Sequence, residues 1–152
     1  MGNSVGPERL INNRLRLYVW AVKDQQGHNL ERLQIIKGWY EDGELKEKVF
    51  DAACSDGKVP HPKTHRCPNS SATVDLSDCS VELNKGNRQL ATVWQDPNFD
   101  QAQAAFYYAR VLENPSCRWT TWDALRNDWP LLDTVPATIQ ERAWSSPIWY
   151  QP

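Results

Sequence analysis

The most regular alternation of apolar and polar positions lies in residues 104–115, AAFYYARVLENP. Residues two apart in a strand share one face of a sheet, so Tyr107, Ala109 and Val111 would point the same way. The aromatic and β-branched residues of this run suit a pleated, half-buried surface. Pro115 would end the strand, because proline lacks the N–H that a ladder needs. The pattern therefore predicts a central β-strand over this stretch.

A second apolar run, AWSSPIWY, occupies residues 143–150. We expect it to be the last strand and to pair with the strand predicted over 104–115. Pro147 lies within this run, which indicates an edge position or a bulge, because proline interrupts the hydrogen bonding of a central strand.

Residues 116–142 separate these two strands and form an insertion with mixed character. A short helix is predicted within it, over Trp122–Asn127. Thr120 or Thr121 would supply the N-cap, since threonine hydroxyls accept hydrogen bonds from the free N–H groups of a first turn.

Shorter apolar runs separated by turn residues predict the remaining strands. Asp42 and Gly43 between two such runs predict a hairpin, because both residues tolerate positive φ. In the strand after this hairpin we expect Leu45 and Val49 to point inward. The five strands predicted upstream of residue 104 are Arg14–Val22, Glu31–Tyr40, Glu44–Ala53, Ala72–Leu76 and Gln89–Gln95.

Seven short strands with frequent turns predict a mainly β fold, an immunoglobulin-like β-sandwich with a short helix between the last two strands. Tyr107 occupies a place that resembles the tyrosine corner of such sandwiches. Residues 1–13 are rich in turn formers and are expected to be a flexible leader. Residues 14–152 would then form a single domain, which suits the length of 152 residues.

The balance of charge excludes some partners. The formal net charge is −2, and a general binder of nucleic acid or of a membrane surface would show a basic patch instead. No stretch is long and apolar enough to span a membrane, and no signal peptide is visible. We therefore expect neither a nucleic-acid partner nor a membrane span.

Four cysteines, Cys54, Cys67, Cys79 and Cys117, suggest two disulfides and an oxidising compartment. Four cysteines allow three pairings, and the sequence alone does not choose among them. Cys54–Cys67 is favoured because it would close a polar loop, which leaves Cys79–Cys117. The alternative is four reduced thiols that serve as small apolar side chains.

The sequence offers little catalytic chemistry. His61, His65 and Cys67, with Cys54 upstream, are close in sequence, but their spacing matches no familiar zinc site. The chain contains neither a G-x-S-x-G motif nor a glycine-rich phosphate loop. We accordingly expect no catalytic residue, no metal ligand and no cofactor in this chain.

One cluster in the insertion has the composition of an interaction surface. Tryptophan and arginine are enriched among the residues that contribute most to binding energy at protein interfaces. The alternatives are a helix packed over the end of the sandwich, and a platform of indoles that stacks on a carbohydrate or peptide ligand. The cluster consists of Arg118, Trp119, Trp122, Asp123, Arg126 and Trp129.

Several runs together resemble the C-terminal region of a bacterial family catalogued as domain of unknown function 3604. They are VWAVKDQQGHNLERLQIIKGW, ATVDLSDC, LATVWQDPNFDQAQAAFYYARVLENPSCRW and TIQERAWSSPIWY, in that order, and they cover about residues 18–150. The YYARV strand followed by AWSSPIW is also similar to the C-terminal sandwich of other proteins with a PHP-like metal-dependent hydrolase domain.

The resemblance implies that chemistry lies upstream, in a domain with a His-x-His signature like that of PHP phosphoesterases. None of the three histidines in this chain matches those positions, so no catalytic or metal residue carries over. The resemblance implies a non-catalytic accessory domain, a fragment or stand-alone copy, that packs on the catalytic domain through residues 116–142. Members of the family are often exported, which agrees with paired cysteines and a periplasmic or extracellular location.

Overall fold

The computed structural model describes residues 2–152, and the fold is a mainly β sandwich with one short helix. A turn of 3₁₀ helix, η1 (Pro7–Arg9), and the helix α1 (Trp119–Asn127) accompany ten strands in this part of the chain. The strands are β1 (Ser4–Val5), β2 (Arg16–Val22), β3 (Leu30–Glu41), β4 (Glu44–Cys54), β5 (Gln89–Gln95), β6 (Ala105–Glu113), β7 (Ser116–Cys117), β8 (Thr138–Ile139), β9 (Arg142–Trp144) and β10 (Ile148–Tyr150).

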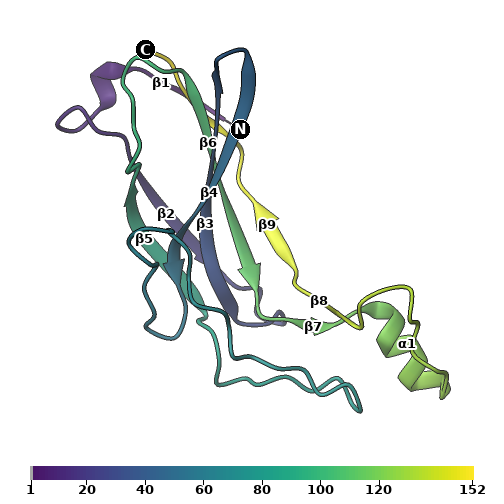
Figure 1. Cartoon of the computed structure of the whole chain (residues 1–152). Helices are drawn as coiled ribbons and strands as arrows, with labels where there is room; N and C mark the ends of the chain where they lie inside the picture. Colours follow the sequence, from purple (N-terminus) through teal and green to yellow (C-terminus); the bar gives the residue numbers. More distant parts are fainter. Residues whose placement is uncertain (1) are drawn as a thin grey trace.

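Two sheets form the layers of the sandwich. The larger sheet has the order β1-β10-β6-β3-β4, and β9 pairs with β6 beside β10. The smaller sheet is the antiparallel pair β2-β5, which faces the larger sheet in Figure 1. The β-sandwich predicted from the alternation is confirmed, and its immunoglobulin-like character stays a prediction.

Strand β6 has the central position that its sequence predicts. It hydrogen-bonds β3 along one edge and both β10 and β9 along the other. Tyr107 pairs with Ile148 and Arg110 pairs with Trp144, so the predicted partner run is correct. The run is split into β9 and β10, and Pro147 lies in the segment between them, where it interrupts no ladder. The expected edge position is not what β10 has, because β1 pairs with its other side.

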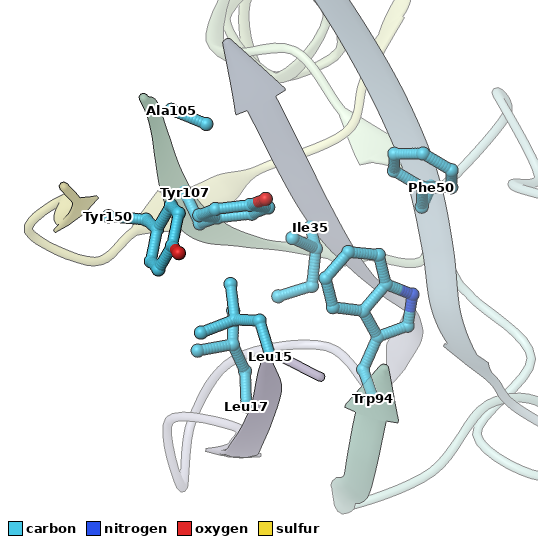
Figure 2. Packing of buried hydrophobic residues seen from close by; sticks show 8 residues of the cluster. All are labelled: Leu15, Leu17, Ile35, Phe50, Trp94, Ala105, Tyr107 and Tyr150. Carbon is cyan, nitrogen blue, oxygen red and sulfur yellow. The ribbon is translucent and has the colours of Figure 1, made fainter. Parts of the chain in front are cut away.

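The core lies between the two sheets (Figure 2). Leu17 and Trp94 project from the smaller sheet toward Ile35, Phe50 and the ring of Tyr107 on the larger one. The rings of Phe50 and Trp94 lie 5.3 Å apart between their centroids, in a tilted arrangement. Tilted aromatic pairs are favourable beyond the area that they bury. The remaining members of this cluster are Leu15, Ala105 and Tyr150.

The β3–β4 hairpin turns at Asp42 and Gly43, with φ of 54° and 81°. Positive φ at both central residues is the requirement of a type I′ hairpin turn, and the predicted hairpin is confirmed. The expectation that Leu45 points inward is wrong, because its side chain is 73% exposed. Phe50 is the inward residue of β4, and Leu45 lies on the opposite side of the pleat.

The prediction of a strand over Ala72–Leu76 is also wrong. This segment contains only an isolated bridge between Val74 and Val81. The side chain of Asp75 instead accepts hydrogen bonds from both the N–H and the hydroxyl of Ser77. Aspartate side chains that bind the local backbone in this way compete with a sheet ladder and favour turns. The hydrogen bonds of Ser77 also lower the pKa of Asp75.

The expected leader and the expected tyrosine corner need correction. Ser4 and Val5 of the 1–13 segment form β1, which is parallel to β10, while residue 1 lies outside the described residues. A short parallel pairing of this kind has no local sequence signal. The hydroxyl of Tyr107 donates to the carboxylate of Asp96 rather than to a backbone carbonyl, so the contact is not a tyrosine corner.

Candidate functional site

The insertion leaves the sandwich through a short two-stranded stem. Ser116 pairs with Ile139 and Cys117 pairs with Thr138. The N–H of Arg118 then donates to the carbonyl of Ala137 at 2.9 Å. The two ends of the insertion are therefore held together at its base, where the chain leaves β6 and returns toward β9.

Two disulfides fix the loops around this stem. Cys54 is bonded to Cys67 and Cys79 is bonded to Cys117, which confirms the favoured pairing. The second bond links β7 at the base of the insertion to the loop between β4 and β5. Two disulfides in a chain of this size are typical of an oxidising compartment of the extracellular type.

The helix of the insertion begins earlier than predicted. It spans Trp119–Asn127, and Arg118 occupies the N-cap position without a side-chain hydrogen bond. Thr121, one of the two expected caps, lies inside the helix and donates its hydroxyl to the carbonyl of Ala137 at 2.7 Å. This tertiary contact secures the first turn to the stem, so the hydroxyl does not serve as a local cap.

The helix points away from both sheets (Figure 1). Trp119 is 70% exposed and Trp129 is 63% exposed. Trp122 is 39% exposed, and the guanidinium of Arg126 lies over its ring at 5.4 Å from the centroid. Thr121 and Ala124, rather than any indole, are the buried residues of the helix. The alternative of a helix that packs its tryptophans over the end of the sandwich is therefore wrong.

The two other members of the predicted cluster have different positions. Arg118 lies in the stem, and its Nε donates to the carbonyl of Pro136 at 3.0 Å. Asp123 is half-buried in α1, and its backbone carbonyl accepts a hydrogen bond from the side chain of Asn127. The structure thus brings Trp119, Trp122 and Arg126 onto one short helix, with Trp129 directly after it.

A buried charged network on the larger sheet was not predicted from the sequence. The carboxylate of Asp51 is fully buried and accepts hydrogen bonds from Arg32 Nη1 at 3.0 Å and Gln34 Nε2 at 2.6 Å. Arg32 also binds Glu31. Burial alone would lower the pKa of Arg32, but Glu31 and Asp51 together raise it above its usual value. These positions could not be found by alternation, because polar residues in a strand normally predict an exposed face.

The histidine and cysteine cluster forms a structural loop. Cys54 and Cys67 are joined in a disulfide, and Nδ1 of His61 accepts hydrogen bonds from the N–H groups of Lys63 and Thr64. Across residues 2–152, no group of three or more His, Cys, Asp or Glu side chains is arranged to hold a metal ion. In the same range no helix has the length and hydropathy needed to cross a membrane.

Comparison with known proteins identifies the family. The family model described as protein of unknown function (DUF3604) matches residues 1–152. The chain belongs to this family. Searches of curated proteins and of solved structures each found no match. The family membership that the strand sequences predicted is thus confirmed.

Proposed function

We propose that this DUF3604 chain is a non-catalytic β-sandwich domain that docks on a metal-dependent hydrolase domain of the PHP-like type, through residues 116–142. The single observation that supports this most strongly is the exposure of the insertion's tryptophans. Trp119 and Trp122 project from α1, which lies away from both sheets, and the exposed Trp129 follows the end of this helix. Soluble proteins seldom leave several large apolar side chains exposed together without a partner.

The neighbouring side chains extend this apolar surface. Leu131 and Leu132 follow Trp129 and are also exposed. Tryptophan is among the residues whose truncation costs most at protein interfaces, and such residues gather at the centre of the contact. The insertion surface, defined here as Trp119, Trp122, Trp129, Leu131 and Leu132, has the composition expected of such a centre.

The stem supports the proposal because it limits the motion of this surface. The Cys79–Cys117 disulfide, the β7–β8 pairing and the hydrogen bond from Thr121 to Ala137 all act at its base. A surface held in its bound orientation loses less conformational entropy on association than a flexible one. An ordered base with an exposed apolar tip suits a permanent contact between two domains.

The first test is a titration of this chain with the PHP-like hydrolase domain encoded upstream of it, produced as a separate polypeptide. We expect Trp119→Ala combined with Trp129→Ala to weaken the complex by roughly tenfold or more, as for central interface residues. Trp144→Ala is the matched control, because Trp144 is also an exposed tryptophan but lies on β9, outside the insertion. Its complex should keep the affinity of the unchanged chain.

Three results would contradict the proposal. The first is a gene without a hydrolase domain before this region. The second is an equal loss of affinity in the Trp144 variant, which would indicate non-specific adhesion. The third is metal-dependent phosphoesterase activity of this chain alone, abolished by a chelator, which would make the domain catalytic.

A second candidate function uses the same exposed indoles. Trp119 and Trp129 could stack on a carbohydrate or peptide ligand, as aromatic side chains in binding modules do. Titration with oligosaccharides and peptides, followed by tryptophan fluorescence, separates the two functions. Saturable quenching that Trp119→Ala and Trp129→Ala abolish, without a complex with the hydrolase domain, would favour the binding module.

We also propose a periplasmic or extracellular location, which the two disulfides support. Both disulfides require an oxidising compartment for their formation and persistence. Fractionation of cells that express the full-length protein, with thiol labelling of each fraction, tests it. Fully labelled cysteines in a cytosolic pool would contradict this location.

A further inference from the structure

A cavity of about 510 Å³ lies where the insertion stem meets the larger sheet. Its volume falls within the roughly 300–1,000 Å³ of typical small-molecule sites. It is bordered by the start of β3, by the loop that follows Cys67, and by the segment from β8 to β9. The charged and polar side chains that matter are Glu31, Arg32, Asn69, Arg118, Gln140 and Arg142.

The charges around this cavity are not balanced. Three arginines line it, against the single carboxylate of Glu31. Arg32 is already paired with Glu31 and Asp51. Arg118 and Arg142 have no carboxylate within 4.0 Å among residues 2–152. Two guanidinium groups therefore face a concave, polar space without a counter-ion from the protein.

The floor of the cavity is buried and held in place. Glu31 and Arg32 are both buried, and the amide of Gln140 donates to Glu31 and to the carbonyl of Glu113. The Nε of Arg32 is buried with no hydrogen-bond acceptor in the described part of the chain. Buried arginine nitrogens are normally satisfied, so the hydrogen-bonding capacity of this guanidinium is not exhausted by its two carboxylates.

The Arg118 side chain is positioned from the stem. Its Nε donates to Pro136, and its own N–H is bound to Ala137. These two contacts leave the terminal nitrogens of the guanidinium available for an external acceptor. The planar array of donors on such a group matches the oxygen atoms of carboxylate and phosphate.

We propose that this space, the arginine cavity, binds a small organic anion that carries carboxylate, phosphate or sulfate groups. Arg118 and Arg142 form the ion pairs with it, while Arg32 lies in the floor and is neutralised by Glu31 and Asp51. None of its lining residues is aromatic, so the site is suited to charged groups rather than to stacking of a sugar ring. This proposal does not depend on the docking proposed for the insertion surface.

The test is calorimetric titration of the whole chain with citrate, inorganic phosphate and inorganic sulfate as separate probes. We expect saturable binding of at least one probe with one site per chain. Arg118→Gln and Arg142→Gln should each weaken it by roughly tenfold, the loss of one charge-assisted contact. The probe that binds most tightly distinguishes a carboxylate ligand from a phosphate or sulfate ligand.

Arg16→Gln is the matched control, because it removes the same charge from an exposed position on β2. It should leave the affinity unchanged within about twofold, a difference below 0.5 kcal/mol. Arg142 makes no side-chain hydrogen bond in the described residues, so its variant keeps the fold even if Arg118→Gln disturbs the stem. Three results overturn the proposal: no saturable binding of any probe, an unchanged affinity in Arg142→Gln, or an equal loss in Arg16→Gln.

Discussion

The hydroxyl of Tyr107 donates a hydrogen bond of 2.8 Å to Oδ2 of Asp96, in the interior of the sandwich. The same carboxylate oxygen lies 2.7 Å from Nζ of Lys37, which is also buried. Asp96 follows β5, Tyr107 is on β6 and Lys37 is on β3, so one carboxylate joins both sheets. Removal of any member leaves the others with unmet polar groups away from water.

Tyr107→Phe should therefore lower the free energy of unfolding by about 1–3 kcal/mol, the cost of a buried hydrogen bond to a charged group. Tyr108→Phe is the control, because the hydroxyl of Tyr108 makes no hydrogen bond within residues 2–152. Its free energy should change by less than about 0.5 kcal/mol. Urea unfolding of both variants measures the difference, and equal values would show that the Tyr107 hydroxyl contributes nothing specific.

Stability should fall at alkaline pH because of the same contact. Burial, followed by the charge of Asp96, raises the pKa of Tyr107 well above its usual value. Burial and Asp100 also raise the pKa of Tyr150. A raised pKa stabilises the folded state fully below the unfolded value of about 10, and this stabilisation is lost as pH rises through the folded pKa. Tyrosinate absorbance is followed with pH for the unchanged chain and for Tyr107→Phe. The difference between the two curves reports the ionisation of Tyr107. Ionisation of Tyr107 near pH 10 in the folded protein would contradict the expectation.

Asp51→Asn should destabilise the fold by about 3–5 kcal/mol, because it removes one partner of a buried ion pair. The change weakens the acceptor of Arg32, Gln34 and the N–H of Cys67. Arg66→Gln is the comparison, since the half-exposed Arg66 lies 3.5 Å from the same carboxylate. An exposed partner of this kind contributes at most about 1 kcal/mol. Thermal and urea unfolding measure both, and similar losses would show that burial does not decide the effect.

Gly38→Ala should destabilise the protein by about 1–3 kcal/mol through overpacking. A Cβ at Gly38 would lie 2.2 Å from the ring of Phe106, so the ring must move. The φ angle of Gly38 is not positive, and the cost is therefore steric rather than conformational. In a Phe106→Ala background the same change should cost almost nothing. A double-mutant cycle of unfolding free energies tests this, and a cost that persists without the ring would contradict it.

The two disulfides should differ in their contribution to stability. Cys79 and Cys117 are separated by 38 residues, and Cys54 and Cys67 by 13. The chain-entropy model gives about 4 kcal/mol for the first and about 3 kcal/mol for the second. Serine substitution of each pair, followed by urea unfolding, measures them. An equal or reversed order would show that the unfolded chain does not govern the effect.

Local patterns predicted the parts of this fold that depend on local chemistry. Alternation placed Tyr107 on a central strand, and Asp42-Gly43 marked the hairpin. The start of α1 was not predictable, because the hydroxyl of Thr121 is used by Ala137 in a contact across the stem. Leu45 was assigned to the wrong face because the inward positions before Phe50 are lysines, including Lys48, whose ammonium lies over that ring.

In the candidate sites, too, features within one short segment could be predicted and features assembled from distant segments could not. The insertion tryptophans could be named from composition, since they are close in sequence. The arginine cavity could not, because Arg32, Arg118 and Arg142 come from separate segments that only the folded chain brings together. Asp51 was missed for a related reason, as its three donors lie on β3 and in the loop after β4.

The stem has a consequence for how much the insertion can change without disturbing the sandwich. Because Ser116 and Ile139 are direct partners, the chain leaves the sandwich and returns to it at one point. Residues 118–137 therefore form a closed loop whose two ends are held together by the β7–β8 pairing. Substitutions on the exposed surface of this segment can therefore leave the register of the two sheets unchanged.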